Sequence, residues 1–117
     1  MPVRWRHRNG GRAGRWLFAV LVSGPSMAPT LRHGDALLVR GTGRAVRPGD
    51  LVVATFRSRP GLLVVKRAVR PCDGGWWVRG DNDLATDDSR SYGVAEVRGR
   101  VVLRYWPAPR WFGYRRV

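Results

Sequence analysis

Ser26 stands at a position where a nucleophile could be displayed. It follows an apolar run, with Gly24-Pro25 directly before it and Pro29 shortly after it. Because proline neither continues a helix nor donates to a sheet ladder, the backbone must bend here, and we expect the hydroxyl to be held at that bend. An ordinary turn serine would have the same surroundings, so this segment alone leaves both interpretations open.

Lys66 is the only lysine among the 22 basic residues; all others are arginine. An arginine keeps its proton in a protein, whereas a desolvated lysine loses it readily, so Lys66 alone could act as an amine base. In the strand expected over 62–69, alternation puts Lys66 on the same face as Val64 and Ala68, where burial would lower its pKa. The alternatives are an edge-strand lysine that reaches water and a coding bias that removed lysine elsewhere.

The segment from Gly80 to Gly93 holds four of the chain's eight acidic residues. So acidic a loop in so basic a chain predicts internal pairing, such as Asp88 with Arg90, and the hydroxyls of Thr86 and Ser89 could reach a neighbouring amine. A calcium loop is disfavoured because no glutamate stands at the twelfth position of an EF-hand pattern.

Three separated motifs, in this order, resemble those of the type I signal peptidase family, serine endopeptidases that work with a Ser/Lys dyad. The motifs are Ser26-Met27-Ala28-Pro29-Thr30-Leu31, Lys66-Arg67, and the segment from Gly80 to Gly93. The resemblance implies that Ser26 is the nucleophile and Lys66 the general base. It further implies that Thr86 orients the lysine, that Asp88 and Arg90 form a supporting ion pair, and that Met27 and Pro29 contact substrate.

Within this family the chain is most similar to the maturation proteases of nickel-type superoxide dismutase, through Trp76-Trp77-Val78 and Leu103-Arg104-Tyr105-Trp106-Pro107. This implies an endopeptidase that removes an N-terminal propeptide from a nickel superoxide dismutase precursor. The alternative within the family is a type I signal peptidase that acts on exported preproteins. A self-cleaving repressor-type protein also uses Ser and Lys, but it lacks the third motif and normally carries a DNA-binding domain for which this length has no room.

Gly24 is a departure from the family pattern, because many signal peptidases have a serine there whose hydroxyl helps to bind the oxyanion. The oxyanion hole would then depend on backbone amides such as that of Ser26. The mechanism requires no metal or organic cofactor, and a single Cys72 with two histidines makes a zinc site unfavourable.

The chain's 117 residues fit one domain. Short runs rich in β-branched residues alternate with Gly, Pro and Asp turns and show no helical periodicity, which predicts a mainly β fold. We expect a single small domain of coiled antiparallel sheets that resembles the signal peptidase catalytic core, with a basic arm over 1–15, the peptidase domain over 16–107 and a basic aromatic tail over 108–117. The arm and the tail are expected to be flexible. The expected strands cover 16–23, 36–40, 51–56, 62–69, 76–79 and 97–106.

The formal net charge of +14 would attract any polyanion or anionic lipid surface. A nucleic-acid or anionic-surface binding module is therefore an alternative function, but it explains neither the single lysine nor the acidic loop. We expect a protein substrate with an N-terminal propeptide or leader, no specific nucleic acid, and peripheral contact with anionic membrane. The longest apolar run, Trp16–Val22, is far shorter than the ~20 residues of a membrane helix, so we expect no transmembrane anchor. The expected location is the cytoplasm or the inner face of the membrane.

Overall fold

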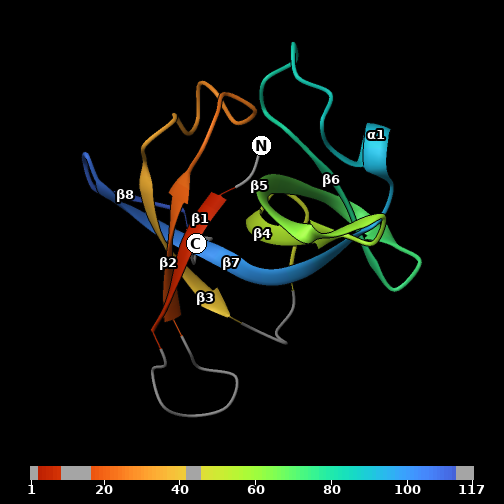
Figure 1. Cartoon of the computed structure of the whole chain (residues 1–117), viewed down its shortest axis with the longest axis horizontal. Coiled ribbons are helices and arrows are strands. Elements are labelled where there is room, and N and C mark those ends of the chain that lie inside the picture. Colours follow the sequence, from red (N-terminus) through yellow and green to blue (C-terminus); the bar gives the residue numbers. More distant parts are fainter. Residues whose placement is uncertain (1–2, 9–16, 42–45, 113–117) are drawn as a thin grey trace.

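The computed structural model describes residues 3–8, 17–41 and 46–112 (Figure 1). These residues are mainly β, as predicted. The elements follow in the order β1 (Val3–Arg8), β2 (Leu17–Val22), β3 (Ala36–Gly41), β4 (Leu51–Phe56), β5 (Arg59–Cys72), β6 (Gly75–Arg79), α1 (Ser89–Tyr92), β7 (Ala95–Trp106) and β8 (Arg110–Trp111).

The strands form one antiparallel sheet in the order β1-β2-β3-β7-β4-β5-β6, with β8 paired to β7. The long strand β7 pairs with both β3 and β4, and β6 returns to it where Trp76 pairs with Ala95. Figure 1 shows β7 joining β1–β3 on one side to β4–β6 on the other. The expected small domain of coiled antiparallel sheets is therefore confirmed.

Two apolar clusters fill the domain, and β4 contributes to both because it is buried over its whole length. Alternation along β4 sends Leu51 and Val53 into the first cluster and Val52 and Phe56 into the second. The first cluster comprises Phe18, Val20, Val22, Met27, Leu31, Leu37, Val39, Leu51, Val53, Val65 and Val101. The second comprises Val52, Ala54, Phe56, Val64, Ala68, Val78 and Ala95.

Each of the six expected strands is present, with β5 and β7 longer than expected. The structure differs at the two ends, where we expected a flexible arm and tail. Val3–Arg8 forms β1 and pairs with β2, and Arg110–Trp111 forms β8. The alternation of arginine with other residues from Val3 to Arg8 is typical of a strand, whereas the high charge of the same residues favours a solvated arm. The remainder of the expected arm and residues 113–117 of the tail lie outside the described residues.

Candidate active site

The turn after β2 fixes Ser26. Gly24 leaves the strand with a φ of 88°, a conformation that L side chains rarely adopt. Met27 and Leu31 are buried in the first cluster and anchor the turn, and the N–H of Leu31 donates to the carbonyl of Met27 at 2.9 Å. Ser26 is only 4% exposed, so the expectation of a displayed hydroxyl is wrong. The segment that follows β6 packs against the turn and covers it.

Gly80 is the residue of that segment that lies directly against Ser26. A Cβ atom on residue 80 would stand 2.7 Å from the carbonyl oxygen of Ser26, so only glycine permits this approach. The N–H of Asn82 donates to the same carbonyl at 3.0 Å, and Asn82 Nδ2 donates to the carbonyl of Pro25 at 3.0 Å. The Gly-Asp-Asn sequence thus works as a backbone clamp on the turn that carries Ser26.

Asp81 ties the same turn to β5. Its Oδ2 accepts from Thr30 Oγ1 at 2.6 Å, and Arg67 donates to both of its carboxylate oxygens, at 3.0 and 2.6 Å. Burial would raise the pKa of Asp81, but the hydrogen bonds from Arg67 and Thr30 hold the pKa below its ordinary value. We assigned no role to this pair from the sequence. The sequence did contain a signal for the pair of Arg67 and Asp81, because these oppositely charged residues belong to two of the three motifs.

Lys66 is fully buried in β5, on the face that alternation predicts. Val64 and Ala68, two positions away on either side, belong to the second cluster. Burial lowers the pKa of the Lys66 ammonium, and the charges of Asp87 and Asp88 oppose that effect. Lys66 Nζ lies 3.5 Å from Asp87 Oδ1 and makes no hydrogen bond within the described part of the chain. An apolar environment of this kind favours the neutral amine that a general base must be.

Gly80 relates the Ser26 turn to the strand that carries Lys66, at the end of the β5–β6 ladder. Arg67 pairs with Arg79 in that ladder, so the next residues outward are Lys66 on β5 and Gly80 after β6. Gly80 in turn touches the Ser26 carbonyl. The three motifs, which are far apart in the sequence, therefore meet at one place.

The predicted ion pair between Asp88 and Arg90 is present, with 2.8 Å between Asp88 Oδ2 and Arg90 Nη2. Asp88 is fully buried and also accepts from the backbone N–H groups of Gly80, at 2.8 Å, and Arg90, at 3.1 Å, the latter capping α1. Burial would raise the pKa of Asp88, but these hydrogen bonds hold it below the usual range. The pair therefore fastens the acidic loop to the residue that touches Ser26.

Thr86 and Met27 lie differently from what their expected roles suggest. Thr86 is exposed, and its carbonyl accepts from Ser91 Oγ; the described residues show no hydrogen bond from its hydroxyl to Lys66. Asp87 is the residue of this loop that approaches the amine. Met27 is 1% exposed and packs in the first cluster. Orientation of the lysine by Thr86 and substrate contact by Met27 stay predictions.

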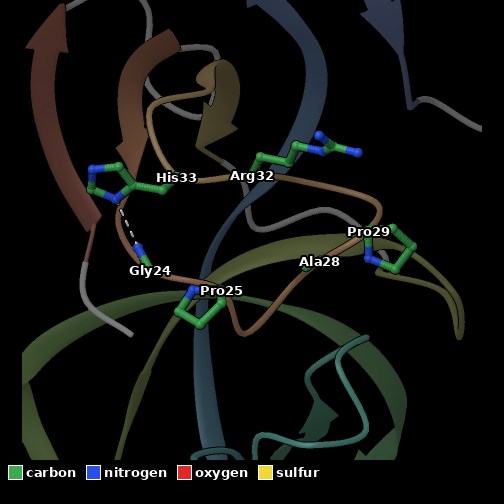
Figure 2. A pocket seen from close by; sticks show the side chains of 6 residues that line it. All are labelled: Gly24, Pro25, Ala28, Pro29, Arg32 and His33. Carbon is green, nitrogen blue, oxygen red and sulfur yellow. Dashed lines mark hydrogen bonds between the residues drawn. The ribbon is translucent and has the colours of Figure 1, made fainter.

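A shallow pocket of about 350 Å³ opens on the Ser26 turn (Figure 2). Pro29, which we expected to contact substrate, is exposed here. The N–H of Gly24 donates to His33 Nδ1 at 3.0 Å, which occupies a backbone donor close to Ser26. His33 carried no signal in the sequence, since only the fold places it opposite Gly24. The pocket is lined by Gly24, Pro25, Ala28, Pro29, Arg32 and His33.

Comparison with known proteins gives one family and a consistent set of relatives. The Peptidase S24-like family model matches residues 4–102. Mitochondrial inner membrane protease subunit 1 of Xenopus tropicalis is 35% identical over 114 aligned positions, covering 75% of this chain and 68% of the relative. The human protein of the same name is 31% identical, covering 75% and 69%. That of Schizosaccharomyces pombe is 35% identical over 123 positions, covering 82% and 78%.

Proposed function

The chain belongs to the Peptidase S24-like family, and from that premise we propose that it is a serine endopeptidase with a Ser26/Lys66 dyad that removes N-terminal leader segments from protein precursors. The observation that carries the proposal is the position of Lys66. It is the chain's single lysine, it is fully buried, and Gly80 links it to the turn that holds Ser26. A lysine selected only for charge would have been placed at the surface, where its ammonium is hydrated.

In the proposed mechanism Ser26 Oγ attacks the carbonyl carbon of the scissile peptide bond while neutral Lys66 Nζ takes the hydroxyl proton. The ammonium then gives this proton to the leaving amine, and an acyl group stays on Ser26. Lys66 next takes a proton from water, which attacks the acyl ester, and the proton returns to Ser26 as the ester bond breaks. We assign to Thr86, from the resemblance to signal peptidases, the orientation of the neutral amine.

The developing oxyanion needs backbone donors, because residue 24 has no hydroxyl. The Gly24 N–H is engaged by His33 Nδ1, which leaves the Ser26 N–H as the donor we propose for the oxyanion. Asp88 and Arg90 support the site indirectly, since they hold Gly80 against the Ser26 carbonyl. In this proposal Pro29 and Met27 border the path of the substrate.

The relatives are named as inner membrane proteases, which favours a substrate that is processed at a membrane, such as an exported preprotein. Processing of a nickel superoxide dismutase precursor rests only on the tryptophan-containing motifs of the sequence. It is retained as one candidate substrate, beside exported preproteins.

No helix in the described ranges is long and apolar enough to cross a membrane. The names of the relatives lend no support to the expected cytoplasmic location. We propose that the net charge of +14 draws the protein to an anionic membrane surface, an attraction that salt would screen. Release from membranes by a high-salt wash would support it, and retention through both high-salt and carbonate washes would contradict it.

The experiment that tests the proposed function is incubation of the purified chain with a nickel superoxide dismutase precursor and with an exported preprotein. Intact-mass spectrometry would then identify any new N-terminus. We expect one of the precursors to lose its leader at a single bond, and Ser26→Ala to leave it intact. Folded protein that cleaves neither, or equal cleavage by Ser26→Ala, would overturn the proposal.

A further inference from the structure

Asp87, a residue of the third motif with no role assigned so far, is a close carboxylate neighbour of the proposed base. Asp87 Oδ1 lies 3.5 Å from Lys66 Nζ. The lysine side chain is fully buried, whereas that of Asp87 is 31% exposed. The oxygen that faces the amine, Asp87 Oδ1, is itself buried, so the pair lies in a poorly hydrated place although the Asp87 side chain is in part exposed. A negative charge at this place opposes the effect of burial, because it stabilises the ammonium that burial disfavours.

The neighbouring Asp88 cannot take this place, although its charge also acts on Lys66. Asp88 Oδ1 accepts from the backbone N–H and Nε of Arg90, and Asp88 Oδ2 accepts from Gly80 N and Arg90 Nη2. Both of its oxygens are thus held by other groups. Of the two adjacent acids, Asp87 is the one that forms an ion pair with the Lys66 amine.

We propose that Asp87 is a positioning residue that pairs with the Lys66 ammonium in the resting protein and so sets the pH above which Lys66 becomes a free base. This rests on the proposed Ser26/Lys66 mechanism. Burial lowers the pKa of Lys66, and the charges of Asp87 and then Asp88 raise it again, so the balance of these effects decides when the amine is neutral. Loss of the Asp87 charge should therefore extend activity to lower pH.

The single lysine makes a direct measurement possible. Uniform labelling with lysine carrying ¹³C at Cε would give one side-chain resonance, that of Lys66, whose titration follows its protonation without any substrate. In Asp87→Asn we expect the titration midpoint to fall by about one pH unit. Asp87→Glu, which keeps the charge, should move it back toward the wild-type midpoint.

A matched control exists in the same loop. Asp83 is 87% exposed and lies 3.5 Å from Arg79 rather than near Lys66, so Asp83→Asn removes the same charge from the loop and should leave the midpoint unchanged. A midpoint that stays or rises in folded Asp87→Asn would overturn the proposal. If Asp87→Asn does not fold, we expect the same fall of the Lys66 midpoint in Asp87→Ala, and an unchanged or higher midpoint there would overturn the proposal.

The pH profile of kcat/KM distinguishes this inference from the proposed function. If both hold, the acidic limb of the Asp87→Asn profile shifts to lower pH by the same amount as the resonance, with up to about tenfold faster cleavage below the wild-type midpoint. A resonance that shifts while the acidic limb stays in place would overturn Lys66 as the base and leave its pairing with Asp87 intact. An unmoved resonance would overturn the role of Asp87 whatever the activity.

Discussion

Gly80→Ala should disable the site without touching either proposed catalytic side chain. The new Cβ would lie 2.7 Å from the Ser26 carbonyl oxygen, whereas ordinary van der Waals contact begins at 3.4 Å, so the backbone at Ser26 or at residue 80 must move by 3.4 − 2.7 = 0.7 Å. Displacement of a reacting group by about 1 Å can cost on the order of 100-fold in rate. We expect kcat/KM to fall between about 10- and 100-fold, with a loss of about 1–3 kcal/mol of stability from the overpacking.

Gly61→Ala is the matched control, because a Cβ there meets no atom within 4 Å. Gly61 lies in β5, the strand that carries Lys66. Cleavage of one leader peptide would be measured for both variants, together with their denaturant midpoints. The expected result is a large loss of kcat/KM in Gly80→Ala and none in Gly61→Ala. Equal kcat/KM for the two variants would refute the argument that the approach of Gly80 to Ser26 positions the nucleophile.

Further predictions concern the turn, the clamp and the ion pair. Gly24→Ser should cost about 1–2 kcal/mol of unfolding free energy, because its φ of 88° strains any L side chain; wild-type stability would contradict this. Asp81→Ala should lower both the unfolding free energy and kcat/KM, since Arg67 and Thr30 lose their shared acceptor. A loss of kcat/KM with unchanged stability would contradict this structural role of Asp81. The pKa of Asp88 is held below 3.8, so its contribution to stability is complete above that pH and is lost as the pH falls through the folded-state pKa. Acid denaturation should therefore be less steep in Asp88→Asn, and an unchanged profile would exclude this contribution.

Local patterns were sufficient to predict β2 to β7 and the pairing of Asp88 with Arg90. Val64, Lys66 and Ala68 alternate with their neighbours, so burial of one face already placed the lysine in an apolar environment. Asp88 and Arg90 are two residues apart and of opposite charge, so their contact needed no knowledge of the tertiary structure.

Contacts set by the tertiary structure could not be predicted in this way. The approach of Gly80 to Ser26 and the bond from Gly24 to His33 depend on where the turn and the loop after β6 come to lie. The loop also brings Asp87 Oδ1 to 3.5 Å from Lys66 Nζ. Residue types within one motif do not reveal which of two neighbouring side chains turns inward.

The most direct test of the Ser26/Lys66 dyad is the kcat/KM of Lys66→Arg on one cleavable leader peptide, with Lys66→Met as a neutral variant of similar length. Arginine keeps the positive charge but cannot give up its proton, so we expect both variants to be as inactive as Ser26→Ala while circular dichroism shows them folded. Cleavage by folded Lys66→Arg at a substantial fraction of the wild-type rate would contradict the dyad.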